Sequence, residues 1–252
     1  MGLWWEKRRP APLDVFTPAM QWGRFRTWIE AVLYRSELRA TTANAWMVYA
    51  TLLKKIKSSW SHVNGRSNRI GRFARHVLAQ QGSHQDVRYL EIGAFEGASV
   101  AFVHALLEGR LSITVVDPFS ENPELPDDFM SRSFATFTQN METVGAKNIV
   151  RVLRGRSIEQ LPKLIEAGEQ FQIINIDGSH ANLDVMLDAV LGWRLLAPGG
   201  LMIFDDYWYR RPDLGRGFRP KLAIDGFVGA MAHEIEVLDV AGQVFIRKKA
   251  GQ

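Results

Sequence analysis

The chain has 252 residues, of which 46% are hydrophobic and 23% are charged, and this balance is typical of a globular protein and excludes wholesale disorder. It contains no cysteine, which excludes disulfides, zinc–thiolate sites and cysteine nucleophiles. The net charge of +4 favours anionic partners only weakly and no run approaches the ~20 apolar residues that span a bilayer, so we expect a cytoplasmic protein with no transmembrane segment and no nucleic-acid partner.

Residues 1–86 are expected to form an N-terminal helical extension. Apolar residues recur at spacings of three and four within 22–33 and again within 46–60, which is typical of amphipathic helices. Residues 58–67, which include Asn64-Gly65, predict a linker. Six of the eight tryptophans lie in this extension, at Trp4, Trp5, Trp22, Trp28, Trp46 and Trp60. Such aromatic residues favour packing on the main domain or on a second subunit of a homo-oligomer; a substrate lid or a basic membrane-surface helix is the alternative.

Residues 87–252 are expected to form the main domain. Short apolar strands alternate with helical segments from Arg88 onward, a pattern that predicts an α/β fold with a parallel sheet covered on both faces. Helices are expected over residues 99–108, 129–144, 158–167 and 182–196, and the last of them stops at Ala197-Pro198-Gly199-Gly200. Two alternating runs joined by Ala241-Gly242 predict a C-terminal antiparallel hairpin.

A glycine-containing turn follows the first strand of this domain. The chain leaves a buried strand at Glu91 and must begin a helix near Ser99, and Gly93 permits both a sharp turn and the close approach of a ligand. Only Gly93 and Gly97 are present, so the turn departs from the Gly-x-Gly-x-x-Gly fingerprint of a dinucleotide site. We assign Glu91, Gly93, Ala94, Gly97 and Ser99 to a cofactor site, with a purely structural turn as the alternative.

Asp117 stands at the end of the second strand, 24 residues after Gly93. An acidic side chain at this place can accept hydrogen bonds from both hydroxyls of a ribose. The alternative is an acid that caps the turn before Pro118. Phe119 follows on the same loop and is expected on the cofactor side.

These motifs resemble the class I S-adenosylmethionine-dependent methyltransferases over about residues 88–248. The matching segments are Glu91-x-Gly93-x-x-x-Gly97 as their first motif, Asp117 as the ribose-binding acid, Gly155-Arg156-Ser157 as the loop beside the adenine, and Pro198-Gly199-Gly200 as the turn before strand five. The resemblance implies a Rossmann-like, seven-stranded, mostly parallel sheet with S-adenosylmethionine across the C-terminal strand ends. It also places Ser157 at the adenine and Asp177 beside the methyl group.

Three carboxylates, those of Asp177, Asp205 and Asp206, follow two neighbouring strands of the expected sheet. They would repel one another unless a cation lay between them, and an all-oxygen set suits Mg²⁺ or another hard divalent ion. Such an ion would lower the pKa of a bound hydroxyl and aim its oxygen at the methyl group. The alternative for Asp206 is a cap on the turn into Tyr207.

The Asp177-Gly178-Ser179-His180 run is similar to that of metal-dependent small-molecule O-methyltransferases, which include the catechol and caffeoyl-coenzyme A types and the macrocin type that acts on sugar hydroxyls. In the catechol type a lysine base stands where His180 stands here, and histidine is a suitable base near neutral pH. The run most resembles the macrocin-type and related family-24 enzymes, in which metal use is not universal. The alternative for His180 is a helix N-cap partner.

Residues 207–220 form a long aromatic and basic segment directly after the proposed metal ligands. Aromatic faces and arginines suit a flat, sugar-like or anionic acceptor, so we expect this loop to form a wall of the acceptor pocket. Contact with a partner subunit is the alternative.

The sequence thus predicts an S-adenosylmethionine-dependent methyltransferase that O-methylates a small sugar-like, phenolic or other natural-product acceptor, with a divalent cation on the three aspartates and His180 as base. Two alternatives stay open: a metal-independent N- or S-methyltransferase, and a non-catalytic cofactor-binding scaffold whose basic N-terminal segment binds a membrane or an acidic polymer. A nicotinamide oxidoreductase is disfavoured because the middle glycine of the dinucleotide fingerprint is missing.

Overall fold

The computed structural model describes residues 43–56, 67–81, 86–107, 110–120, 127–215 and 217–250. The helix expected within 22–33 lies outside the described residues, as does the linker except for its last residue. The second apolar series forms a helix over residues 43–53, in which Ala45 and Leu52 are buried. Among the described residues, no helix combines the length and the apolarity needed to cross a membrane.

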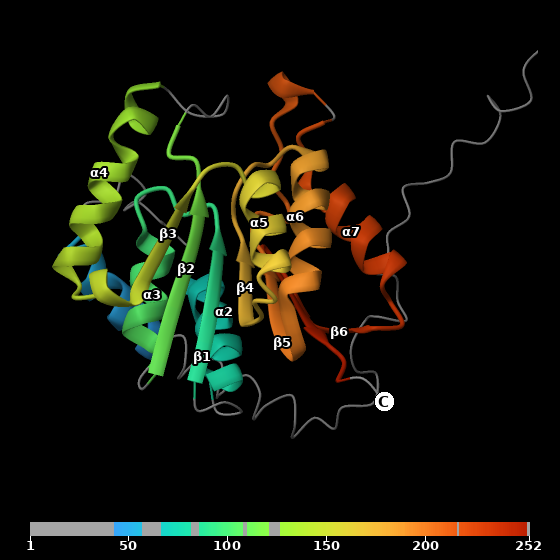
Figure 1. The fold of residues 1–252 in the computed structure, drawn as a ribbon, viewed down its shortest axis with the longest axis horizontal. Helices are drawn as coiled ribbons and strands as arrows, with labels where there is room; N and C mark the ends of the chain where they lie inside the picture. The colour runs from blue at the N-terminus through green and yellow to red at the C-terminus, as the bar shows by residue number, and fades with distance from the viewer. Residues whose placement is uncertain are drawn as a thin grey trace, which may run out of the picture.

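Seven strands form one sheet in the order β3-β2-β1-β4-β5-β7-β6 (Figure 1). They are β1 (Asp86–Ile92), β2 (Arg110–Asp117), β3 (Val150–Arg154), β4 (Phe171–Ile176), β5 (Leu196–Phe204), β6 (Ile235–Val240) and β7 (Val244–Lys248). The first five pair in parallel, whereas β7 pairs antiparallel with both β5 and β6. The predicted mostly parallel sheet with a C-terminal hairpin is confirmed.

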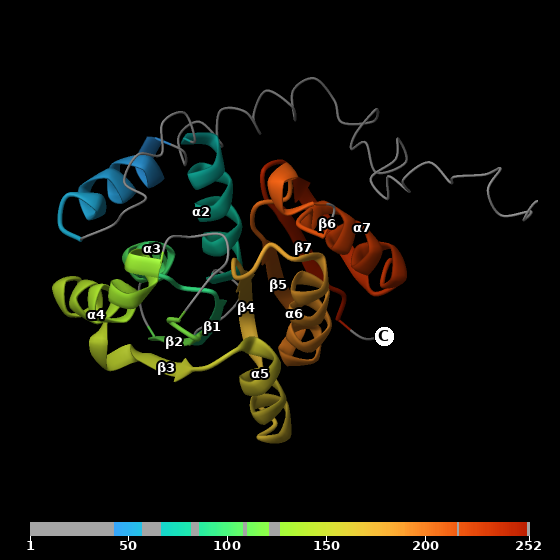
Figure 2. The same cartoon turned by 90° about the horizontal axis from the view of Figure 1, so that it is seen from above.

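Six helices flank the sheet on its two faces (Figure 2). They are α2 (Ser67–Gln81), α3 (Ala98–Leu106), α4 (Asp127–Thr143), α5 (Ser157–Glu166), α6 (Asn182–Leu195) and α7 (Pro220–Ala230). The helices expected in the main domain correspond to α3, α4, α5 and α6, with each end within two residues of its expected place.

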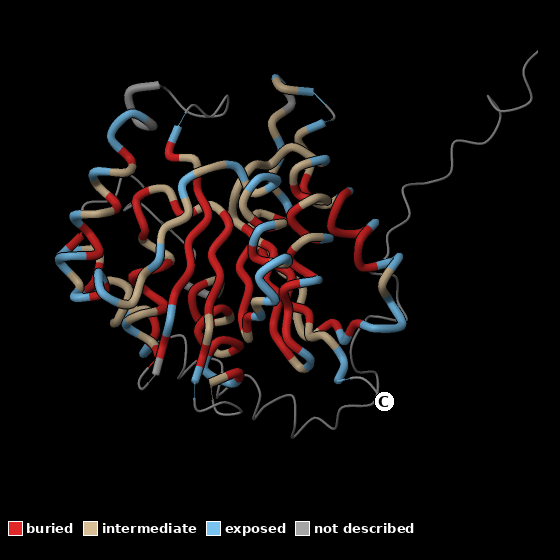
Figure 3. The backbone as a smooth tube through the Cα atoms, in the orientation of Figure 1, coloured by how far each residue is buried: buried red, intermediate tan, exposed pale blue. Residues whose placement is uncertain are grey.

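Side chains of successive strand residues enter two separate apolar cores. On β1, Tyr89 packs in the core under α2, α3 and α4, while Leu90 packs in the core under α5, α6 and α7, and both are fully buried. Ile173 and Ile174 of β4 divide in the same way. A strand buried on both faces reads as an unbroken apolar run, which explains the near-continuous buried colour of the central strands in Figure 3.

Helix α2 lies along the sheet with its first turn at the C-terminal edge of the strands. Ile70, Phe73, Ala74 and Val77 are buried and recur at spacings of three and one, so one face of the helix joins the core. At the far end of α2, Nε2 of Gln80 donates a hydrogen bond of 3.1 Å to the carbonyl of Gly199, which precedes the buried part of β5. The helix thus runs from the C-terminal end of β5, near Asp205, to its N-terminal part at Gly199.

The segment expected as a turn before strand five lies inside β5. The strand already begins at Leu196, and its register with β4 shifts between Phe171 and Ile173. Gly199 takes a φ of +74°, which accommodates the kink. The proline and glycines therefore bend a strand that has begun, since the chain after α6 pairs with β4 at once.

Candidate active site at the C-terminal edge of the sheet

The central strands end side by side at one edge of the sheet and are joined there by backbone hydrogen bonds. Each residue that follows a strand donates its N–H to the last or next-to-last carbonyl of its neighbour: Gly93 to Val116 at 2.9 Å, Asp177 to Ile92 at 2.8 Å, and Asp205 to Ile176 at 3.0 Å. Polar residues that follow these strands are thereby brought to one place, as parallel sheets require.

Gly93 and Gly97 each have a structural reason to be glycine. Gly93 has a φ of +85°, and a Cβ there would lie 2.4 Å from the carbonyl oxygen of Asp177. Gly97 has a φ of +82° at the N-cap of α3, and a Cβ there would lie 2.8 Å from side-chain atoms of Phe137 and Met141. The turn is therefore compressed between β4 and α4, and no other residue fits either position without movement.

Asp117 holds this turn against the end of β2. Its Oδ2 accepts hydrogen bonds from the N–H groups of Ala94 at 2.7 Å and Phe95 at 2.9 Å, and its Oδ1 accepts one from Phe119 at 2.6 Å. Asp117 thus caps the glycine turn and its contact with Phe119 spans Pro118, but its side chain is buried rather than exposed. Because each carboxylate oxygen can accept more than one hydrogen bond, the predicted contact with a ribose is compatible with this arrangement.

Glu91 is fully buried and lies in a polar network next to the turn. Tyr89 donates its hydroxyl to Oε2, Ser99 donates to Oε1 at 2.5 Å, and Nδ2 of Asn175 lies 3.2 and 3.3 Å from the two oxygens. Burial, reinforced by the negative charge of Asp177, raises the pKa of Glu91 to about 8. Glu91 and Ser99, predicted as cofactor ligands, therefore hold each other and support the turn from below.

Ser157 and Phe119 occupy the flanks of the edge. Ser157 begins α5 and hydrogen-bonds Asp188 of α6, whose pKa burial raises to about 7. The sequence analysis did not single out Asp188, since an acid within an amphipathic helix usually faces water. Phe119 is buried against Phe134 and Phe137 of α4, with ring centroids 5.0 and 5.3 Å away.

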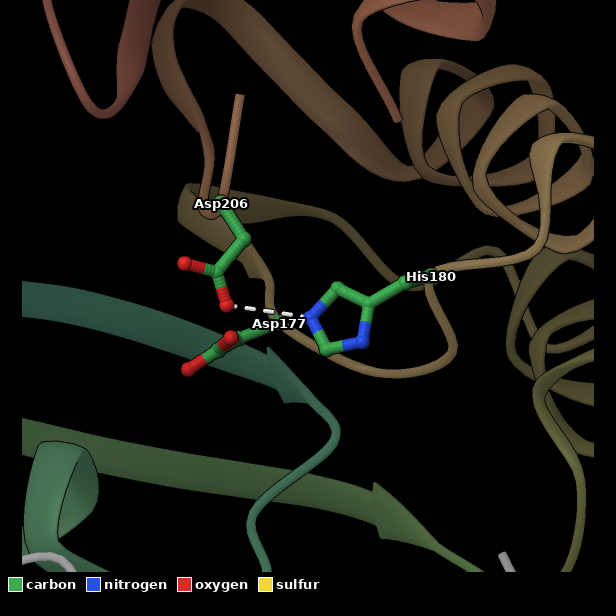
Figure 4. A group of neighbouring side chains, drawn as sticks. All are labelled: Asp177, His180 and Asp206. Carbon is green, nitrogen blue, oxygen red and sulfur yellow. Dashed lines mark hydrogen bonds and ion pairs between the residues drawn. The ribbon is translucent and has the colours of Figure 1, made fainter. Parts of the chain in front are cut away.

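Asp177, His180 and Asp206 form a cluster at the ends of β4 and β5 (Figure 4). Each offers one ligand atom, and these atoms lie within 4.8 Å of one another. Nε2 of His180 lies 3.0 Å from Oδ2 of Asp206, and the ring stacks on Tyr209 with centroids 3.9 Å apart. The N-cap residue of α6 is Ala181, and no side chain caps this helix. His180 instead pairs across the site with Asp206.

The two aspartates of this cluster differ in acidity. Burial, reinforced by the negative charge of Asp206, raises the pKa of Asp177 to about 7. Burial acts on Asp206 in the same direction, but hydrogen bonds and positive charge from His180 and Arg69 outweigh it and hold the pKa of Asp206 below its usual value. Asp206 is therefore the permanent anion of the site, and Asp177 titrates near neutral pH.

Asp205 lies beside the cluster and is held by Arg69 of α2. Its Oδ1 forms an ion pair with Nη2 of Arg69 and accepts the N–H of Asp206 at 2.6 Å. The same Nη2 lies 3.1 Å from Oδ1 of Asp206. Of the three aspartates predicted as metal ligands, two thus share the cluster with His180, and the third is paired with an arginine that the sequence analysis did not single out.

The segment expected to line the acceptor pocket starts from an anchored tyrosine. Tyr207 is buried and donates its hydroxyl to Asp225 at 2.8 Å, and Lys221 donates to both at 2.6 Å. Trp208, the next residue, is 54% exposed and has its ring 5.5 Å from the Lys221 ammonium. The buried anchor fixes the start of the loop, and the indole is left available at the surface.

Residues 90–207 match a family model described as a methyltransferase domain. This range includes the glycine turn and the cluster of Asp177, His180 and Asp206. Among curated proteins, the O-methyltransferase hkm8 of Aspergillus hancockii is 29% identical over 125 residues. That match covers 49% of this chain and 44% of the relative, so the chain spans less than half the length of the curated protein that it matches.

Solved structures share the fold. An O-methyltransferase from Bacillus cereus in complex with S-adenosylhomocysteine is 15% identical, with a TM-score of 0.53 over 83% of this chain and 91% of its own. MycE, a methyltransferase of the mycinamycin biosynthetic pathway in complex with Mg and S-adenosylhomocysteine, is 18% identical, with a TM-score of 0.55 over 80% of this chain and 54% of its own. Residues 90–207 therefore match a methyltransferase domain, and the chain has the fold of these solved methyltransferases, as the resemblance of its motifs implied.

Proposed function

We propose that this chain, as a class I methyltransferase, transfers the methyl group of S-adenosylmethionine to a hydroxyl oxygen of a small molecule. The observation that carries the proposal is the Asp177, His180 and Asp206 cluster, which lies at the strand ends directly beside the glycine turn. The turn supplies close backbone approach for the cofactor, and the cluster supplies a base and anionic ligands next to it. The one curated relative described above is an O-methyltransferase.

The transfer is an in-line displacement in which the acceptor oxygen forms a bond to the methyl carbon as the carbon–sulfur bond breaks. The products are the methyl ether and S-adenosylhomocysteine, and the hydroxyl proton must leave. His180 accepts this proton through Nδ1, because Nε2 donates its hydrogen to the Asp206 carboxylate 3.0 Å away, and Asp206 stabilises the imidazolium that forms. Tyr209, stacked on the imidazole, fixes the ring plane so that the base is positioned before the substrate arrives.

We assign the cofactor to the turn formed by Gly93, Ala94 and Gly97, with the ribose at Asp117 and the adenine near Ser157. Glu91 and Ser99 act on the cofactor through the shape of the turn, since both are engaged beneath it. Phe119 closes the same side because its ring is fixed against α4.

The donor set also fits a hard divalent cation such as Mg²⁺. Asp177 and Asp206 would hold it, with Asp205 adjacent, because carboxylate oxygens on neighbouring strand ends are the ligands that such ions prefer. The cation would polarise the acceptor oxygen. One observation favours the metal-independent alternative: Arg69 already brings a positive charge to Asp205 and Asp206.

The acceptor is proposed to be a sugar-like or phenolic hydroxyl compound bound against the 207–220 loop. Exposed Trp208 offers a flat apolar face beside a cation, which suits such rings. We further propose that the aromatic N-terminal extension mediates a homo-oligomer.

The His180→Gln variant tests the assignment of the base. We expect kcat to fall by about 10²- to 10⁴-fold, because a positioned base contributes that much, while the dissociation constant for S-adenosylhomocysteine stays within about threefold of the native value. Methyl transfer to hydroxylated small molecules and calorimetric binding are the two measurements. His233→Gln is the matched control, since the His233 side chain is 72% exposed and pairs only with Glu234. Full turnover by His180→Gln would remove the base from the mechanism.

Chelation tests the cation. We expect EDTA to abolish turnover and added Mg²⁺ to restore it, with Asp206→Asn inactive under both conditions. If the EDTA-treated protein keeps full activity, or methylates amines or thiols in preference to hydroxyls, the metal-independent N- or S-methyltransferase is the correct function. Retention of S-adenosylhomocysteine without turnover on any hydroxyl, amine or thiol acceptor would instead leave the scaffold alternative.

A further inference from the structure

We propose that Arg69 is a positioning residue whose guanidinium competes with a divalent cation for the Asp205 and Asp206 carboxylates. The inference rests on the cation site proposed above and goes beyond it, since it assigns the state of that site when no cation is bound. Arg69 lies on α2, outside the residues that match the methyltransferase domain model, and contacts a residue 137 positions later in the chain.

The contact geometry carries the first step. Nη2 of Arg69 forms an ion pair with Oδ1 of Asp205 and lies 3.1 Å from Oδ1 of Asp206. The three side chains are only 20%, 13% and 27% exposed, so water screens their charges little. One nitrogen atom thus bridges two adjacent carboxylates that a cation would otherwise attract.

Oxygen atoms of both carboxylates also have other partners in the site. Oδ2 of Asp206 is taken by His180, and Oδ1 of Asp205 also accepts the N–H of Asp206. A cation that bound the two carboxylates through their Oδ1 atoms would therefore meet Arg69 there. Two positive charges at one pair of oxygens repel, and the guanidinium must withdraw before Asp205 can join Asp177 and Asp206 as a ligand.

Helix α2 does not need this contact in order to stay on the sheet. Arg72, one turn further along, forms an ion pair with Asp239 of β6, and the apolar face of α2 is buried in the core. Arg69 can therefore change partners while the helix remains in place. Its positive charge balances the Asp205 and Asp206 carboxylates.

Binding of Mn²⁺ to the full chain, followed by electron paramagnetic resonance, tests the competition. We expect Arg69→Met to bind Mn²⁺ at least about tenfold more tightly than the native chain, because a competing positive charge is removed from a partly buried site. Arg69→Lys, which keeps the charge, should bind within about threefold of native. Arg72→Met is the matched control: it removes the same charge from the same helix and should leave Mn²⁺ affinity within about threefold. If Arg69→Met does not fold, Arg69→Gln gives the same comparison.

The outcomes separate this inference from the proposed function. Equal or weaker Mn²⁺ binding by Arg69→Met, with binding abolished by Asp206→Asn, overturns the competition and leaves the cation site intact. An equal gain in Mn²⁺ affinity for Arg69→Met and Arg72→Met also overturns the competition, because the gain would then come from the lower net positive charge of the chain. If no variant binds Mn²⁺ while S-adenosylhomocysteine binds normally, both the competition and the cation fail, and the cofactor site stands.

Discussion

Gly93 lies in the turn that we propose binds the cofactor, against the loop that carries Asp177. A methyl group at Gly93 would lie 2.4 Å from backbone atoms of Asp177 and Gly178, neither of which can rotate away. We expect Gly93→Ala to lower the free energy of unfolding by at least about 3 kcal/mol, because the penalties for a left-handed backbone and for overpacking add together. The same substitution should abolish binding of S-adenosylhomocysteine.

The matched control for Gly93→Ala is Gly199→Ala. Gly199 has a similar φ of +74°, but a Cβ there would meet nothing within 4 Å. Its substitution should cost only the backbone penalty of about 1–2 kcal/mol and leave cofactor binding unchanged. Urea denaturation and calorimetry measure both effects, and equal losses at the two glycines would show that the close approach to Asp177 is unimportant.

Glu91 links the buried network to pH. Burial raises the pKa of Glu91 from 4.5 to about 8, so the folded chain keeps a proton that the unfolded chain loses. The stabilisation is complete below pH 4.5 and is lost as the pH rises toward 8, by at most about 1.4 kcal/mol per pH unit. Asp177, with its pKa raised to about 7, acts in the same direction. We therefore expect the free energy of unfolding to fall between pH 5 and pH 8.

Glu91→Gln should make this decline shallower, because a neutral amide binds no proton in either state. Urea denaturation at several pH values gives the slope. Glu142→Gln is the control, since Glu142 is a surface residue paired with Lys147 and should leave the slope unchanged. An identical slope for native chain and Glu91→Gln would contradict a protonated Glu91.

At the residue scale, the motifs predicted where side chains lie better than which side chains they bond to. The sequence placed Asp177, His180 and Asp206 at adjacent strand ends, because parallel strands bring such residues together whatever the loops do. It did not pair Asp205 with Arg69, which is separated from the Asp205–Asp206 pair by more than 130 residues and stands in a helix with no motif. Nor did it show that Asp117 binds the turn itself, since a carboxylate that caps a loop and one that holds a ribose have the same sequence signature.

At the element scale, α2 belongs to the folded core. Phe73 is 6% exposed and lies 6.0 Å from the Phe102 ring of α3. We expect Phe73→Ala to destabilise the chain by about 3–5 kcal/mol, because it removes a large buried side chain and leaves a cavity. Leu78→Ala on the same helix is the control: Leu78 is 38% exposed, and its loss should cost about 1 kcal/mol or less. Denaturation in urea provides both values, and similar small losses would mean that α2 is docked too loosely to contribute to the core.

The helices and strands differ in how far the sequence predicted them. The helices α3 to α6 and the terminal hairpin followed from period and turn residues, because each is a local pattern. The start of β5 was not predicted, because Pro198 and Gly199 are typical of a turn. In the structure the backbone already pairs with β4 at Leu196. Tertiary pairing with an adjacent strand decided that boundary over local propensity.

At the scale of the whole molecule, strand order is what unites the separate motifs. The order β3-β2-β1-β4-β5 puts β1 at the centre, so the glycine turn after β1 lies between the acid of β2 and the cluster at β4 and β5. The resemblance implied a seven-stranded sheet with the cofactor across the C-terminal strand ends. The strand order itself was not predicted, because it leaves no mark in the periodicity of any one strand. The same order brings the motifs from Gly93 to Asp206 to one edge of the sheet.

The fold therefore predicts which adenosine-containing ligand stabilises the full chain. A ligand that binds only the folded state at about 100 times its dissociation constant adds about 2.7 kcal/mol, which for a domain of this size raises the melting temperature by about 5–10 °C. We expect S-adenosylhomocysteine to produce this shift and NAD at the same concentration to produce none, because the turn has Gly93 and Gly97 alone where a pyrophosphate site needs three glycines. Differential scanning calorimetry measures the shift, and Gly93→Ala should remove it whereas Gly199→Ala should keep it. A shift with NAD and none with S-adenosylhomocysteine would contradict the cofactor assignment and, with it, methyl transfer at the Asp177 cluster.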